Sequence, residues 1–236
     1  MAIHTEILGA TALVVLERPE KANAYDRAHL DALDEALGAL GPDVRALVVA
    51  SGGERAFCAG ADLTELHVAD PLDALDLRSQ RVFNRLAALP IPTIAAVQGP
   101  AVAGGCELAL ACDIRIVGPS ARFSLPETAL GLIPSAGGCT RLTRLVGPSR
   151  AKMVILAGAH IDAETAVSCG LALRLAPDPR AAALSLATDL AKRDPVALRL
   201  AKAIIDRGED RASLETERVS EALLYARKRA AGNPRR

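Results

Sequence analysis

The sequence predicts an α/β fold, in which strands and helices alternate over the first two-thirds of the chain and helices dominate the last third. Two observations lead to this prediction. Short aliphatic runs alternate with segments whose apolar residues recur at helical spacing, and Gly or Pro separates them after short connections. In addition, 50% of the 236 residues are hydrophobic, so the chain can bury a sizeable core.

The first elements are read from apolar runs and the turn signals that end them. Residues 11–16 form an aliphatic strand that stops at an Arg-Pro pair. Residues 26–40 carry leucines at helical spacing and stop at a Gly-Pro pair, which predicts a helix. Residues 46–50 form a buried strand that a Ser-Gly-Gly turn closes.

The middle of the chain is expected to continue this alternation. Asp62 is expected to cap a short helix, with Glu65 three residues later completing a capping box. A longer helix is expected from Asp70 to Leu89, because its apolar residues share one face until prolines interrupt it. A strand at residues 93–97 follows, and residues 98–100 read as a turn.

The rest of the chain brings one more buried helix, two strands and then mostly helices. Gly104-Gly105 is expected to open a helix over residues 106–112, and strands are expected at residues 114–117 and near 171–175. Later helices are expected at residues 141–146, 149–156, 163–168, 181–192, 196–207 and 213–228. Residues 1–190 are expected to form the core and residues 191–236 a C-terminal helical region.

The composition argues against several classes of protein. Twenty-eight basic residues balance 28 acidic ones, and only 2% of residues are aromatic, so a nucleic-acid-binding surface is not expected. No apolar run approaches the roughly 18 residues of a membrane span, and no signal peptide is visible. Five cysteines without a CxxC pair and four histidines without HxxxH spacing predict reduced thiols and no metal site. We therefore expect a cytoplasmic protein that binds neither nucleic acid nor membranes.

Two glycine-containing turns lead directly into helix starts, at residues 56–63 and 99–108. A helix start leaves backbone N–H groups unpaired, and small residues allow a ligand to approach them. Two such donors that converge would form an oxyanion hole. The alternative is that both are tightly packed helix entries, and spacing alone does not decide between the two. Neither turn matches a nucleotide-binding loop, and the serine-hydrolase GxSxG motif is absent.

Two glutamates lie among apolar residues and are candidates for acid–base chemistry. Glu107 is in the first turn of an apolar helix, and Glu127 follows Pro126 between apolar stretches. Burial makes a carboxylate costly to ionise, which moves its pKa toward the range of a useful acid or base. The alternative for Glu107 is that it only stabilises the positive end of its helix, and for Glu127 that it is a surface acid.

Four segments together carry a resemblance to a known family: residues 18–24, 57–63, 96–113 and 126–142. In this order they resemble the crotonase superfamily of enoyl-CoA hydratases and isomerases, over residues 5–225. The resemblance implies a spiral of repeated strand–strand–helix units. It also implies that the acyl-CoA site lies in the core and that the C-terminal helical region serves trimer assembly.

The resemblance also assigns roles to individual residues. The backbone N–H groups of Ala61 and Gly104 match the positions that bind the thioester oxygen, and Glu107 and Glu127 match the two catalytic glutamates of the hydratases. The residues implied in binding the coenzyme A thioester are Ala22, Ala24, Ala59, Ala61, Asp62, Leu63, Thr64 and Gly104.

Because both glutamates are present, the resemblance implies an enoyl-CoA hydratase, which adds water reversibly to a 2-enoyl-CoA thioester in fatty acid or branched acyl-CoA metabolism. It implies no cofactor, since coenzyme A is part of the substrate, and a homotrimer or dimer of trimers. Two alternatives remain. One is a Δ3-Δ2-enoyl-CoA isomerase that shuttles a proton on one glutamate. The other is a non-catalytic acyl-CoA-binding protein, which two departures favour: Thr64 replaces a frequent Lys, and the family's closing pattern is not recognisable after Tyr225.

Overall fold

The computed structural model describes residues 3–62, 64, 77–208 and 211–230. Its central element is a six-stranded sheet with the strand order β1-β2-β3-β4-β6-β9. These strands are β1 (Ile3–Leu8), β2 (Thr11–Leu16), β3 (Ala46–Ser51), β4 (Thr93–Val97), β6 (Ile114–Val117) and β9 (Arg174–Leu175). β1 pairs antiparallel with β2, and every other pairing is parallel. Parallel strands need crossover connections, so helices must cover the sheet on both faces.

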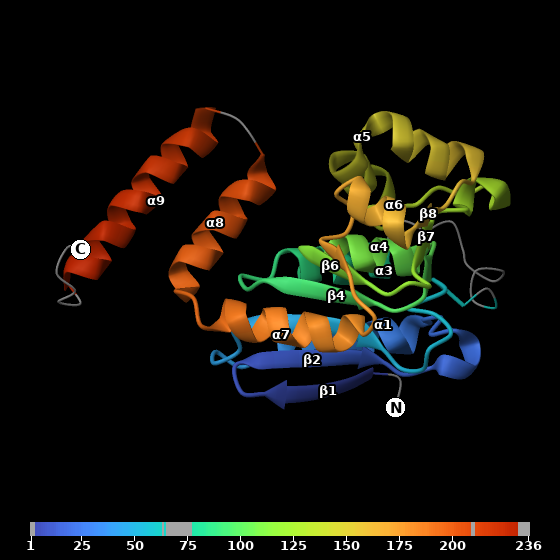
Figure 1. Cartoon of the computed structure of the whole chain (residues 1–236), viewed down its shortest axis with the longest axis horizontal. Helices are drawn as coiled ribbons and strands as arrows, with labels where there is room; N and C mark the ends of the chain where they lie inside the picture. The colour runs from blue at the N-terminus through green and yellow to red at the C-terminus, as the bar shows by residue number, and fades with distance from the viewer. Residues whose placement is uncertain (1–2, 63, 65–76, 209–210, 231–236) are drawn as a thin grey trace.

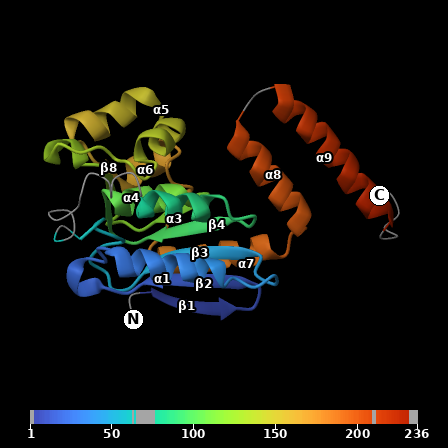
Figure 2. The same ribbon diagram turned by 180° about the vertical axis from the view of Figure 1, so that it is seen from behind.

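The two faces of the sheet are covered by different helices (Figures 1 and 2). α7 (Pro179–Ala191) lies on one face, in contact with β2, β3, β4 and β6. α1 (Arg27–Gly38), α3 (Arg78–Ala87) and α4 (Gly104–Ala111) lie on the other face. Alternate residues of the strands therefore enter two separate apolar layers: Val48 belongs to the α7 layer, whereas Leu47 and Val49 belong to the layer under the other helices.

A second, three-stranded sheet has the order β5-β7-β8. Its strands are β5 (Pro100–Val102), β7 (Arg122–Ser124) and β8 (Ile161–Asp162). Each of two successive units places one strand in the large sheet and the next in the small sheet, and then adds a helix. The units are β4-β5-α4 and β6-β7-α5, where α5 spans Gly138–Ala157 and the 3-10 helix η2 (Glu127–Leu130) precedes it. The predicted α/β class and its strand–strand–helix repeat are confirmed.

The C-terminal helices lie beside this body. α6 (Ala163–Ser168) precedes β9, while α8 (Pro195–Arg207) leaves the end of α7 and α9 (Arg211–Ala230) returns alongside it (Figure 1). Lys202 of α8 donates to the Ile91 carbonyl at 3.2 Å and to Asp113 at 2.8 Å, which ties α8 to the large sheet. No helix in the described part of the chain is long and apolar enough to cross a membrane.

Several predicted elements need correction. β1, β7 and β8 were not expected. β1 is a mostly exposed edge strand whose sequence mixes polar and apolar residues. β7 and β8 are only three and two residues long. The turn expected at residues 98–100 overlaps β5, which begins at Pro100. The strand expected near residues 171–175 is reduced to β9, because Leu171 and Ala172 enter the core instead.

The helix boundaries also differ from the prediction. The helix expected from Asp70 is described only from Arg78, because Leu77 has a non-helical ψ of 86° and residues 70–76 lie outside the described residues. Glu65, the expected partner in a capping box, lies outside them too. The two helices expected at residues 141–146 and 149–156 are parts of α5, which kinks at Gly147 (φ 78°, ψ 161°).

Candidate active site

The two glycine-containing segments that lead to Ala61 and to Gly104 pair with each other in parallel. Cys58 and Ala101 form a parallel bridge, and the N–H of Val102 donates to the Cys58 carbonyl at 2.9 Å. From this bridge, three further residues lead to Ala61 on one segment and to Gly104 on the other. A Cβ on Gly60, the residue before Ala61, would lie 3.1 Å from the Gly104 nitrogen, so Ala61 and Gly104 lie close together.

Each of these two residues presents a backbone N–H group for which the described residues supply no hydrogen-bond acceptor. Ala61 bridges to Tyr25, whose N–H donates to the Gly60 carbonyl at 2.9 Å and whose carbonyl accepts from the Asp62 N–H at 2.7 Å. The N–H of Ala61 therefore points away from Tyr25. Gly104 is the first residue of α4, where an N–H has no acceptor inside the helix. Two free donors side by side can bind one oxyanion.

The backbone around these donors is strained and closely packed. Ala103 has φ 50° and ψ −125°, a conformation that L-residues rarely adopt, and its N–H donates to the Ser124 carbonyl at 2.9 Å. Gly60 has φ 95°, and a Cβ there would lie 3.0 Å from the Ala103 side chain and 3.1 Å from the Gly104 nitrogen. A glycine at position 60 therefore allows the two segments to approach this closely.

Glu107 lies on the same face of α4 as Gly104, one helical turn along. Its Oε1 accepts hydrogen bonds from the backbone N–H groups of Ala136 at 2.7 Å and Gly138 at 2.9 Å. The carboxyl is bound to the start of α5, and the alternative that it only stabilises its own helix does not account for these bonds. Burial raises the pKa of Glu107 to about 7; the two N–H donors oppose this rise and the charge of Glu127 adds to it.

Glu127 begins η2, which Thr128 ties to α5 by donating from its hydroxyl to the Ile155 carbonyl at 2.7 Å. The Oε2 atom of Glu127 is buried, and no described residue forms a hydrogen bond with it. Burial raises the pKa of this carboxyl as well, so it is not the solvated surface acid that the sequence left open. The charge of Glu127 adds to the raised pKa of Glu107, so the two carboxyls lie within electrostatic reach of each other.

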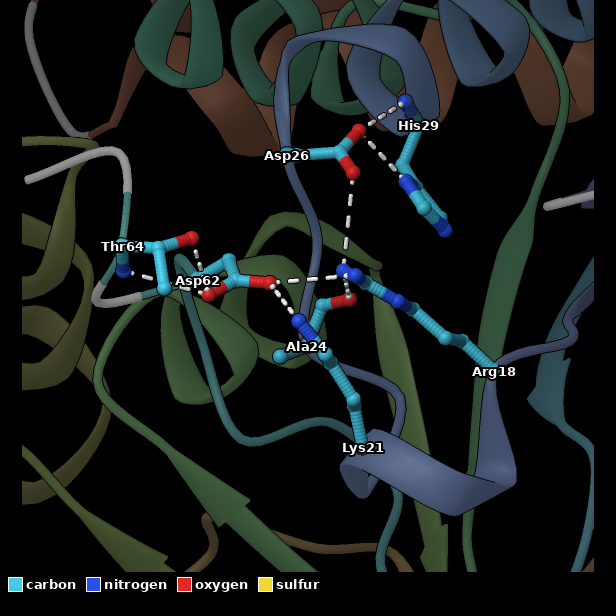
Figure 3. Close-up of polar contacts among 7 residues, drawn as sticks. All are labelled: Arg18, Lys21, Ala24, Asp26, His29, Asp62 and Thr64. Atoms are coloured by element: carbon cyan, nitrogen blue, oxygen red, sulfur yellow. Dashed lines mark hydrogen bonds and ion pairs between the residues drawn. The ribbon is translucent and has the colours of Figure 1, made fainter.

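A cluster of charged residues lies beside the Ala61 segment (Figure 3). Oδ2 of Asp62 pairs with Lys21 at 2.8 Å and with Arg18 at 3.1 Å, and Oδ1 accepts from the Thr64 hydroxyl at 2.8 Å. Arg18 also donates to the Ala24 carbonyl at 3.2 Å. The hydrogen bonds from Lys21 and then from Thr64 hold the pKa of Asp62 well below its usual range. The cluster fixes the chain directly after Ala61, at Asp62 and Thr64.

The remaining predicted site residues contribute backbone rather than side-chain groups. Ala22 adopts the left-handed conformation (φ 51°), and its carbonyl accepts from the Ala59 N–H at 3.0 Å. Ala24 offers its carbonyl to Arg18, as described above. Leu63 lies outside the described residues. Among the predicted residues, Asp62 provides a side chain that anchors the Ala61 segment, whereas its partners Arg18 and Lys21 were not among the predicted site residues.

Sequence reasoning missed the groups that hold the Glu107 carboxyl. Arg141 donates from Nη1 to the Ala136 carbonyl at 2.8 Å and from Nη2 to Asn84 Oδ1 at 2.5 Å, and so fixes the turn whose N–H groups bind Glu107. The sequence marks this turn only by the glycine pair Gly137-Gly138, at which α5 begins. Within the described ranges no group of three or more His, Cys, Asp or Glu residues could hold a metal ion.

This α/β fold, with two backbone donors near the buried carboxyl of Glu107 and the half-buried carboxyl of Glu127, defines a class of enzyme that polarises a carbonyl oxygen and moves protons on neighbouring atoms. Residues 6–231 match the family described as enoyl-CoA hydratase/isomerase. The chain belongs to this family.

Individual relatives are similar to this chain over most of its length. It is 37% identical to the short-chain-enoyl-CoA hydratase of Clostridium acetobutylicum, covering 85% of this chain and 79% of the relative. It is 40% identical to the 2,3-dehydroadipyl-CoA hydratase of Escherichia coli, covering 91% and 86%. The solved structure of Pseudomonas aeruginosa DspI superposes with a TM-score of 0.90 at 39% identity over 95% of both chains. That of a Bacillus anthracis enoyl-CoA hydratase has a TM-score of 0.92 at 34% identity, covering 98% and 94%.

Proposed function

We propose that this protein is an enoyl-CoA hydratase, which adds water across the 2,3 double bond of an enoyl-CoA thioester to give a 3-hydroxyacyl-CoA. The relatives named as hydratases support this activity. The observation that carries it is the pair of carboxyls, the buried Glu107 and the half-buried Glu127, near two backbone N–H groups for which the described residues supply no acceptor. Isomerisation needs one proton-transferring group, whereas hydration needs one for the hydroxyl and one for the carbon.

The two backbone donors account for the activation of the double bond. With the thioester oxygen between the N–H groups of Ala61 and Gly104, electrons move from the C2–C3 double bond toward that oxygen as hydroxide adds. The negative charge develops where the donors already point, so their stabilisation is greater in the transition state than in the ground state. This makes C3 electrophilic and gives C2 enolate character.

The two carboxyls account for the protons. A water molecule between Glu107 and Glu127 gives its hydroxyl to C3 and one proton to the carboxylate of the pair, while the carboxylic acid of the pair gives its proton to C2. The number of protons on the pair is the same before and after, as a reversible catalyst requires. Raised pKa values support this role, because they allow one member of the pair to stay protonated near neutral pH.

The test is an assay of purified protein with crotonyl-CoA, longer and branched 2-enoyl-CoAs, and the matching 3-hydroxyacyl-CoAs. Hydration or dehydration of at least one member is expected. Turnover of 3-enoyl-CoA without hydration of any 2-enoyl-CoA would instead support the isomerase alternative. Tight acyl-CoA binding without any turnover would support a non-catalytic protein. Activity that survives exhaustive chelation supports the proposal that no metal takes part, and activity without any added organic cofactor supports the proposal that none is needed.

The assembly and location are also proposals. We propose a homotrimer or a dimer of trimers in which residues 191–236 serve the contacts between subunits, because α8 and α9 lie beside the body and contact each other. Light scattering that finds a monodisperse monomer at micromolar concentration would reject it. We propose a cytoplasmic location, which the free thiols of all five cysteines support and imaging of a tagged chain would test.

A further inference from the structure

Tyr25 touches both halves of the oxyanion hole. Its backbone pairs with the Ala61 segment through the two hydrogen bonds to Gly60 and Asp62. Its side chain crosses to the other segment: a Cβ on Gly104 would overlap the Tyr25 hydroxyl and lie 2.7 Å from Cζ and 3.0 Å from Cε1. The phenol therefore lies in direct contact with the backbone of Gly104.

The phenol ring is held firmly in this position. It is 9% exposed and meets the Phe83 ring edge to face, with centroids 5.8 Å apart and an interplanar angle of 88°. The Ser79 side chain lies near the phenol and acts to lower its pKa, against the larger effect of burial. Both supporting residues belong to α3, which packs against α4. Burial is the main cause that raises the pKa of Tyr25, and the nearby Cys58 and Glu107 raise it further. The phenol therefore stays protonated over the working pH range.

We infer that Tyr25 is a positioning residue that sets the separation between the Ala61 and Gly104 donors, its backbone fixing one and its side chain the other. This inference rests on the proposed function, since the donors matter only if they bind a thioester oxygen. Donors preorganised at the correct spacing stabilise an oxyanion far better than donors that must move into place. The competing explanation is that Tyr25 is only a core residue.

Kinetics separate the two explanations. Tyr25→Leu keeps the backbone clamp on Ala61 but removes the part of the side chain that reaches Gly104. Since a misplacement of about 1 Å can cost roughly 100-fold, we expect kcat to fall about 10- to 100-fold while KM changes less than threefold. Tyr25→Phe retains the ring and should recover most of the activity. The pH profile should keep its shape, because the phenol does not titrate. Leu37→Ala, a buried change in α1 away from the site, controls for loss of stability alone.

A double-mutant cycle tests the contact itself. Gly104→Ala keeps the N–H donor, but its methyl group overlaps the Tyr25 ring, so this single variant should unfold or lose activity. Introduced into Tyr25→Leu, the same change should cost much less, because the leucine leaves space for the methyl group. In Tyr25→Phe it should remain harmful, since Cζ still lies 2.7 Å from the new Cβ. Additive effects in all backgrounds would overturn the inference.

A spectroscopic measurement makes the result independent of turnover. A conjugated aryl-enoyl-CoA bound to the Glu107→Gln/Glu127→Gln variant should absorb at longer wavelength, because hydrogen bonds to the thioester oxygen draw electrons along the conjugated system. Adding Tyr25→Leu should remove at least half of this shift while the dissociation constant stays within threefold. An undiminished shift would show that Tyr25 is only a core residue. If the wild-type protein hydrates no enoyl-CoA, the proposed function fails, whereas the cycle and the shift still decide the role of Tyr25.

Discussion

The carboxyl of Glu107 in α4 accepts a hydrogen bond from the backbone N–H of Gly138, the first residue of α5, at 2.9 Å. The Ala136 N–H donates to the same oxygen at 2.7 Å, so two backbone donors fix Oε1. A buried carboxyl that is oriented by fixed backbone donors is restricted to one geometry. This relationship makes the entry of α5 part of the candidate active site.

The first prediction concerns the two carboxyls. Glu107→Gln and Glu127→Gln keep side-chain size but remove proton transfer, which typically contributes about 100- to 10,000-fold. Each single change should lower kcat within that range, and the acyl-CoA dissociation constant should stay nearly unchanged. The double change should cost far less than the product of the two, because both groups act on one water molecule. Single variants that retain turnover within about threefold of wild type would contradict the proposed mechanism.

The second prediction follows from the pKa of Glu107, which burial raises from 4.5 to about 7. Below pH 4.5 the Glu107 carboxyl is protonated in both the folded and the unfolded chain. Between pH 4.5 and 7 it stays protonated only in the folded chain, so the free energy of unfolding decreases as pH rises through this window. Glu107→Gln should therefore gain stability relative to wild type between pH 5 and 8, by at most about 3 kcal/mol. Chemical denaturation at several pH values measures this difference. A difference that is constant with pH would contradict the raised pKa.

Coupling within the pair gives a third prediction. The negative charge of Glu127 contributes to the raised pKa of Glu107, so Glu127→Gln should lower the pKa of Glu107. Carboxyl ¹³C NMR of labelled protein can follow this titration directly without requiring activity. An unchanged or higher pKa in the variant would place the two carboxyls too far apart to share one water molecule.

The fourth prediction concerns the charged cluster. Asp62→Asn removes the charge that Arg18 and Lys21 share at 3.1 and 2.8 Å. The Ala61 segment should loosen, and KM for acyl-CoA should rise roughly tenfold, about the effect of one charge-assisted hydrogen bond, with a smaller change in kcat. Asp189→Asn is the matched control, because Asp189 pairs with Lys192 at 2.8 Å on the exposed face of α7. Equal effects of the two substitutions on KM would show that the cluster has no role in the site.

The fifth prediction uses the strained backbone of Ala103, with φ 50° and ψ −125°. Ala103→Gly should stabilise the fold by about 1 kcal/mol, because glycine adopts this conformation without steric cost. The control, Ala201→Gly on the exposed side of α8, should destabilise by about 1 kcal/mol. Thermal or chemical unfolding of both variants measures the contrast. A loss of stability at both positions would show that residue 103 carries no strain.

Much of the fold and the site could be predicted from the sequence alone. The strands β2, β3 and β4 and the helix α1 were predicted within one or two residues because their apolar spacing is a local property of the chain. The glycine-containing turns at residues 56–63 and 99–108 were noticed for the same reason, since small residues before a helix are a local signal, but the choice of Ala61 and Gly104 as donors came from the family resemblance. The pairing of Glu107 with Glu127 came from the family resemblance.

The tertiary structure decided what those residues contact. Glu107 meets the N–H groups of Ala136 and Gly138, and Tyr25 reaches Gly104 across the site, although each pair is far apart in sequence. Periodicity reports only which face of an element is apolar, whereas these contacts depend on how two elements approach after the sheet has formed. The same reason explains why β1, β7 and β8 were missed, because a short or half-exposed strand is defined by its partner more than by its own residues.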